Sequence, residues 1–271
     1  MAFPQVATYT EEGHAQSTTI TMTYPASCAS GDLIIAILAT DGDNSVSNYD
    51  VDDDFTQIVS GNDPSGKDAH LSVAYRVYDG TEGSTFRWTI SSSEKAASVV
   101  FRITGADTST NLPEGTLTQG DNANPNPPSH DTTQGTKDYL WIACMGADDD
   151  DAATAWPYAD NNRGTTSADP GGCAVAACTD ELTGDTQDPG TFTIPATEEW
   201  VAATIAVFPF PGTIHNISPD NSAHAHQSQE SSTSFTWSVS PDNSAHAHQS
   251  EEPTAGEAGL FSEYPSSNKD G

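Results

Sequence analysis

Residues 70–91 read HLSVAYRVYDGTEGSTFRWTIS and decide the fold class of this chain. Apolar side chains occupy every second position in both halves of the stretch: Leu71, Val73, Tyr75 and Val77, then Phe86, Trp88 and Ile90. The intervening DGTEGS is rich in turn-forming residues. A period of two on both sides of a turn predicts two β-strands, each with one apolar face.

Four other segments are more continuously apolar than these two strands: residues 32–42, 96–107, 138–148 and 198–210. Such runs are typical of central strands that are covered on both faces. Gly, Pro, Asn, Asp and Ser cluster between the segments, and no long stripe with a period of 3.6 residues occurs. The sequence therefore predicts an all-β domain over residues 1–210, an antiparallel β-sandwich of jelly-roll type.

Two polar regions interrupt or follow the apolar runs. Residues 107–135 form a long, Pro-rich connection, which we expect to be an extended arm or a surface loop used for contacts. After the phrase FPFPG at 208–212 the composition shifts to Ser, His, Asn, Pro and Glu. We expect residues 211–271 to be a separate C-terminal tail.

The net charge and the distribution of apolar residues exclude several classes of function. The formal net charge of −31 would repel nucleic acid and anionic membrane surfaces. No stretch reaches the roughly 18 apolar residues of a spanning helix, and the first residues lack the features of a signal peptide, so we expect synthesis in the cytoplasm.

The cysteines are too few and scattered for a disulfide scaffold, and we expect all four to be small buried apolar groups: Cys28, Cys144, Cys173 and Cys178.

Few sequence motifs of this chain indicate a catalytic or metal-binding site. The acidic runs at 41–45, 52–54 and 148–151 could supply oxygen ligands for calcium, but none continues into a twelve-residue calcium loop, and solvated loop carboxylates are the alternative. No nucleophile elbow and no catalytic cysteine phrase occurs. We therefore expect a protein that is not an enzyme.

The tail contains a repeat with a period of 22 residues. Residues 218–230 read SPDNSAHAHQSQE and residues 240–252 read SPDNSAHAHQSEE, so each copy carries one His-Ala-His pair: His224 with His226, and His246 with His248. Residues two apart on an extended chain project to the same side, about 6.6 Å apart. Three chains around a threefold axis would bring six imidazoles together, which suits a transition metal. Solvated polar turns are the alternative reading of these histidines.

Three segments carry a resemblance to a known group of proteins: GDLIIAILATDGD, LSVAYRVYDGTEGSTFRWTISSSEKAASVVFRITGAD and DPGTFTIPATEEWVAATIAVFP. Over residues 1–209 the chain resembles a β-sandwich module of virion proteins from tailed phages and marine phage-like sequences. The tail is similar to His-rich repeats appended to phage structural and fibre proteins, in which His-x-His pairs on a threefold axis bind metal. That precedent implies a metal-ligand role for His224, His226, His246 and His248 only.

These observations lead to two expectations of function. The first is a virion surface protein, either a capsid decoration protein or a head or tail fibre component, which forms homotrimers and docks to other virion proteins such as the major capsid or tail proteins. The alternative is a carbohydrate-binding adhesin that recognises a host glycan, with Trp156 and Tyr158 as the stacking side chains. Loop aromatics that cap the sandwich are a further explanation for these two residues.

Overall fold

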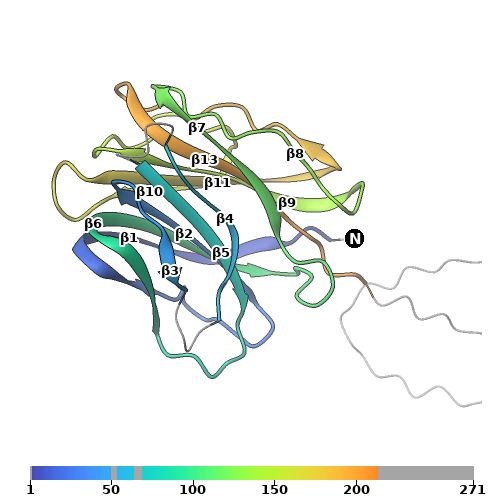
Figure 1. The fold of residues 1–271 in the computed structure, drawn as a ribbon. Helices are drawn as coiled ribbons and strands as arrows, with labels where there is room; N and C mark the ends of the chain where they lie inside the picture. The colour runs from blue at the N-terminus through green and yellow to red at the C-terminus, as the bar shows by residue number, and fades with distance from the viewer. Residues whose placement is uncertain (1, 50–53, 64–68, 213–271) are drawn as a thin grey trace, which may run out of the picture. The chain divides into compact units, whose positions relative to one another are not determined.

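The computed structural model describes residues 2–49, 54–63 and 69–212. These residues form strands and loops, and none of them belongs to a helix long and apolar enough to cross a membrane. Two antiparallel sheets pack face to face (Figure 1). The predicted β-sandwich is confirmed.

The first sheet, sheet A, is built from the N-terminal half of the chain. Its strand order is β1-β6-β2-β5-β4, and β3 pairs with β6. The strands are β1 (Gln5–Thr23), β2 (Leu33–Asp41), β3 (Val46–Asn48), β4 (Thr56–Asn62), β5 (Ala69–Val77) and β6 (Thr85–Thr104).

The second sheet, sheet C, is built from the C-terminal half, in the order β10-β11-β9-β13-β7. Its strands are β7 (Glu114–Asn122), β9 (Lys137–Asp148), β10 (Asp160–Thr166), β11 (Cys173–Gly184) and β13 (Glu198–Val207). A separate two-residue ladder joins β8 (His130–Asp131) to β12 (Thr186–Gln187). Each sheet thus comes from one contiguous half of the chain, whereas a jelly roll is built from two Greek keys. The order of the strands was not predicted, because a residue pattern fixes strands but not their pairing.

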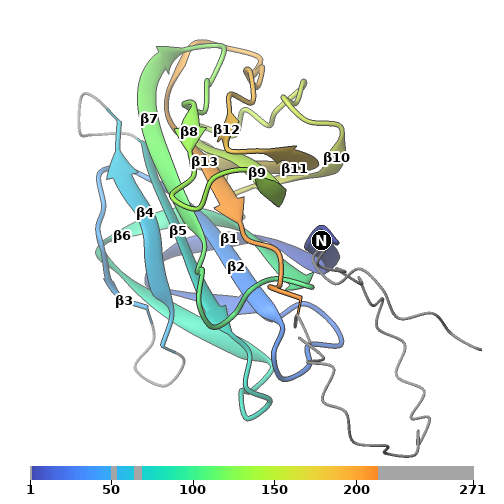
Figure 2. The ribbon, with the colours of Figure 1, turned by 90° about the vertical axis from the view of Figure 1, so that its right-hand side faces the viewer.

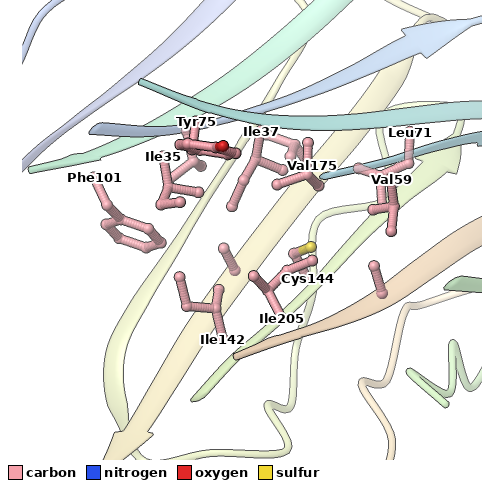
Figure 3. Packing of buried hydrophobic residues seen from close by; sticks show 14 of the residues in the cluster. Ile35, Ile37, Val59, Leu71, Tyr75, Phe101, Ile142, Cys144, Val175 and Ile205 are labelled. Atoms are coloured by element: carbon pink, nitrogen blue, oxygen red, sulfur yellow. The ribbon is translucent and has the colours of Figure 1, made fainter. Parts of the chain in front are cut away.

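The main core lies between the two sheets and takes alternate residues from the central strands (Figure 3). Ile35 and Ile37 of β2 face Ile142 of β9 and Ile205 of β13 across the interface, and all four are fully buried. Leu71, Val73 and Tyr75 of β5 belong to the same core, so the apolar face that the period-two pattern predicted in residues 70–77 is buried here.

The outer face of sheet A is covered by the chain itself. β1 and β6 form one long ladder with register shifts between His14 and Thr19, and its far end, residues 19–23 with 85–90, packs back on the sheet. We call these residues the fold-back ribbon. Trp88 of the ribbon is fully buried in a cluster that includes Ile34 and Leu38, the alternate residues of β2. The expectation that such strands are covered on both faces is confirmed, and the second cover is this ribbon.

The outer face of sheet C is covered by loops. Phe192 donates its backbone N–H to Pro125 O (2.8 Å), and Ile194 donates to Ala123 O (3.0 Å), so two connections pair above the sheet. Beneath them lies a third buried cluster, which includes Trp141 of β9. Apolar side chains on both sides of β9 and β13 therefore reach a core.

Residues 107–135 were expected to be a loop or arm, and this prediction is wrong for their central part. Residues 114–122 form β7, which pairs with β13 along its whole length as an edge strand of sheet C. Figure 2 shows β7 beside β4, and a Cβ built on Gly61 of β4 would lie 3.2 Å from the Leu117 side chain of β7. An edge strand has one paired neighbour and a largely exposed surface, so the polar sequence EGTLTQGDN lacks the apolar alternation by which a strand is recognised.

The four cysteines are all free thiols. Cys144, Cys173 and Cys178 are buried as expected, and burial raises the pKa of each thiol. Cys173 belongs to the core between the sheets and Cys178 to the outer cluster, so they occupy opposite faces of β11. Cys28 departs from the prediction, because it is only partly buried and its Sγ donates to Pro25 O at 3.1 Å.

Candidate functional site

An acidic cluster forms where β9 ends and β13 begins. The two strands are antiparallel neighbours with Ala147 opposite Trp200, so Asp148 and Asp149 at the end of one strand meet Glu198 at the start of the other. One carboxylate oxygen of each residue lies within 4.8 Å of the other two. We call Asp148, Asp149 and Glu198 the acidic cluster.

The electrostatics of the cluster favour a positive partner. Partial burial raises the pKa of Glu198, and the carboxylates of Asp149, Asp151 and Glu199 raise it further. Repulsion among like charges makes ionised carboxylates costly, and a cation would relieve that cost. Carboxylate oxygens are the ligands that calcium takes in proteins. Three carboxylates could therefore hold a hard divalent cation, and the calcium prediction for this segment remains a prediction.

The sequence located only part of the cluster. It pointed to the run 148–151, but Asp150 has a different partner: its carboxylate accepts hydrogen bonds from the N–H groups of Gly171 (2.7 Å) and Gly172 (3.3 Å) and from Ser167 Oγ (3.3 Å). Asp150 thereby fixes the loop that precedes β11. Glu198 was missed, because only strand pairing brings it to residues 148 and 149.

The other two acidic runs do not form a comparable group among the described residues. In the run 41–45 the buried Asn44 donates to Thr40 Oγ1 at 3.2 Å and accepts from Ser91 Oγ at 3.1 Å, which ties the loop to β6. In the run 52–54 only Asp54 falls within the described residues. The calcium prediction there is untested.

The two aromatic residues that we considered for glycan stacking both pack on the outer face of sheet C. Tyr158 is 6% exposed and belongs to the buried cluster, so neither face of its ring is open to a sugar. Trp156 is partly buried against that cluster, with its ring centroid 5.7 Å from that of Phe192 in an edge-on contact. Both residues cap the sandwich, and only Trp156 keeps exposed surface for a ligand.

A buried polar network that sequence reasoning missed lies on the outer face of sheet A. His70 Nδ1 lies 2.6 Å from Asn62 Oδ1, and His70 Nε2 lies 3.3 Å from Ser60 Oγ. This order of groups is that of an orienting residue, a base and a hydroxyl. Burial lowers the pKa of His70 to about 4, however, whereas a general base works best when its pKa is near the ambient pH. The network therefore lacks a poised base, and it stabilises the pairing of β4 with β5.

His224, His226, His246 and His248 lie outside the described residues, so their predicted metal binding stays a prediction. No protein-family model, no curated protein and no solved structure matches this chain.

Proposed function

We propose that this chain is a non-enzymatic surface protein of a phage-like particle, in which a rigid β-sandwich carries a C-terminal segment used for assembly. In this proposal the tail repeats mediate trimer formation and docking to other particle proteins, such as the major capsid or tail proteins. The sandwich is the body that the particle displays. Function is then mechanical, through surface buried at subunit contacts.

The observation that supports the proposal is the position of the domain boundary. The three buried clusters consist of residues between Val6 and Phe208. The chain is then fixed to the sandwich edge, where Phe208 O accepts from Asp107 N and Phe210 N donates to Gly105 O, both at 2.8 Å. The 22-residue repeats begin only after this point. A short polar phrase kept in two copies beyond a completed core is suited to contacts with a partner.

Charge supports an exposed location. With 39 acidic and 8 basic residues, the chain repels other chains of its kind at long range. Two arginines of the sandwich are paired with carboxylates: Arg102 Nε lies 2.6 Å from Asp32 Oδ2, and Arg76 pairs with Glu82. The excess negative charge would keep particles dispersed. Assembly must then overcome this repulsion locally, which metal-bridged histidines would do.

The test is the mass of the full chain in solution by light scattering, with metal analysis before and after a chelator. We expect a trimer with bound transition metal that dissociates when the chelator is added. Replacing all four residues His224, His226, His246 and His248 by Gln should give a metal-free monomer with an unchanged β-sheet spectrum. The matched control replaces Asn221 and Asn243 of the same repeats by Ser, and it should remain a trimer. A metal-free monomer of the unaltered chain would contradict metal-mediated assembly.

A carbohydrate-binding adhesin is the second candidate, and the partial exposure of Trp156 is the observation that favours it. If Trp156 stacks on a sugar, Trp156→Ala should abolish binding on a glycan array. Trp141→Phe, at a fully buried position of the same cluster, should leave binding unchanged. Absence of glycan binding by the unaltered chain would remove this candidate.

A further inference from the structure

His130 lies in an unusual environment for an imidazole. It belongs to β8, is only 7% exposed, and its ring centroid lies 6.2 Å from that of Trp141 in an edge-on contact. Among the described residues neither ring nitrogen of His130 has a hydrogen-bond partner, and the indole N–H of Trp141 has none either. A buried polar group without a partner costs free energy, on the order of 1–3 kcal/mol. The closed structure therefore favours the neutral form of His130.

The segment that carries His130 has only a short backbone ladder, and most of its other hydrogen bonds to the domain involve side chains. We call residues 128–133 the β8 cover. β8 pairs with β12 over only two residue pairs, Asp131 with Thr186 and His130 with Gln187. Further hydrogen bonds run from Thr132 N to Asp185 O (2.7 Å) and from Thr204 Oγ1 to Pro128 O (2.6 Å). Short ladders of this kind open at lower free energy than the central strands of a domain.

Two carboxylates act on His130, and neither is placed to stabilise a charged imidazole well. Glu114 of β7 has Oε1 3.8 Å from His130 Nε2, but its two oxygens already accept from Thr133 N (2.7 Å) and Thr133 Oγ1 (2.9 Å). Asp131 of β8 accepts from Thr186 Oγ1 at 2.6 Å. β9 presents the uncharged Trp141 ring, and β12 presents Thr186 and Gln187. Burial lowers the pKa of His130 and outweighs the opposing effects of Glu114 and Asp131.

We propose that the β8 cover is an acid-operated flap: protonation of His130 releases residues 128–133 and uncovers the part of the outer apolar face of sheet C around Trp141. The uncovered surface would contain the ring of Trp141, which is fully buried in the closed structure and in edge-on contact with His130. The remainder of the sandwich would stay folded, because the core between the sheets is not involved. This device is independent of the function proposed for the C-terminal tail.

The direction of the pH response follows from the difference in proton affinity of His130 between the open and closed states. In the open state His130 is solvated and titrates near pH 6.5, whereas in the closed state it resists protonation. The equilibrium constant for opening should therefore rise as the pH falls below about 6.5. The increase is at most about tenfold per pH unit, and it ends at the pKa of the closed state.

The test is amide hydrogen exchange of the full chain at pH 7.0 and pH 5.5, with each rate corrected for the intrinsic effect of pH. We expect protection of the amides of residues 129–133 to fall at pH 5.5, by up to about eightfold, while the amides of β2 and of the doubly paired β9 keep their protection. His130→Phe should remove the pH dependence, and His130→Gln should do the same if Phe does not fit. The matched control is His14→Gln, on β1, which should behave like the unaltered chain.

Three outcomes would overturn the proposal. Protection in residues 128–133 could be the same at both pH values in the unaltered chain. The loss could persist in both His130→Phe and His130→Gln, which would assign it to other groups. It could also extend equally to β2, which would mean that acid unfolds the whole sandwich rather than the β8 cover.

Discussion

Gly120 of β7 leaves the space that the indole of Trp200 occupies on the neighbouring strand. The two residues are register partners in the β7–β13 ladder, and a Cβ built on Gly120 would lie 2.3 Å from Cζ2 of the Trp200 ring. The Trp200 side chain is 4% exposed and belongs to the outer cluster of sheet C. Because Gly120 on the edge strand β7 has no side chain, the Trp200 ring of the neighbouring strand β13 can pack in this position.

Gly120→Ala should destabilise the domain by about 1–3 kcal/mol, because the ring cannot move without displacing the loops above it. Chemical denaturation gives the free energy of unfolding. The control is Gly83→Ala, where the nearest atom to an added Cβ is 3.9 Å away; this change should be neutral or slightly stabilising. Equal effects of the two substitutions would mean that Trp200 does not need the space at Gly120.

At the scale of the element, the fold-back ribbon turns a two-layer sandwich into a structure with a covered outer face. Its bend is held by Glu12, whose carboxylate accepts from the N–H (2.8 Å) and the hydroxyl (2.6 Å) of Thr23, eleven residues further along β1. Trp88 of the ribbon makes edge-on contacts with Tyr49 (4.9 Å) and Phe55 (5.6 Å) between ring centroids. The ribbon is thus bound both by its backbone neighbour and by an aromatic cluster.

Trp88→Ala should cost about 3–5 kcal/mol of unfolding free energy, the usual effect of removing a buried aromatic side chain. Phe210→Ala, at a position that is 53% exposed, should change stability by less than about 0.5 kcal/mol. Urea titration followed by circular dichroism measures both. If Trp88→Ala cost less than about 1 kcal/mol, the ribbon would not belong to the cooperative core.

At the scale of the whole molecule, three described histidines make the domain sensitive to acid. Burial lowers the pKa of His14, His70 and His130, so the unfolded chain binds protons more readily than the folded one. A group of this kind stabilises the fold fully above pH 6.5, and its contribution is lost as the pH falls below that value. The net charge of −31 adds repulsion at neutral pH that salt screens.

Lowering the pH from 7 to 5 should cost about 2 kcal/mol through His70 alone, since its pKa in the fold is about 4. Unfolding free energies of the full chain at the two pH values test this. In His70→Gln the difference between the two pH values should shrink by that amount, whatever the substitution does to stability at pH 7. An undiminished difference in His70→Gln would assign the acid response to other groups.

The sequence by itself determined the fold class and the core. Alternation in residues 70–91 and the continuously apolar runs depend on local side-chain order, and each predicted segment lies in a strand with its apolar face buried. Residues 85–91 and 96–104 belong to one continuous strand, β6, rather than to two. Composition alone also predicts a domain end near residue 210. In the acidic cluster, Asp148 and Asp149 could be named because they are neighbours in a visible run.

Only the tertiary structure decided the features that depend on pairing between distant segments. β7 was missed because an edge strand needs backbone partners from β13 rather than an apolar pattern of its own. Glu198 joins Asp148 and Asp149 only through the β9–β13 register, and Tyr158 is buried only because loops close over sheet C. The fold-back of β1 and β6 and the closure over His130 are likewise set by contacts between residues far apart in the chain, which a local pattern does not encode.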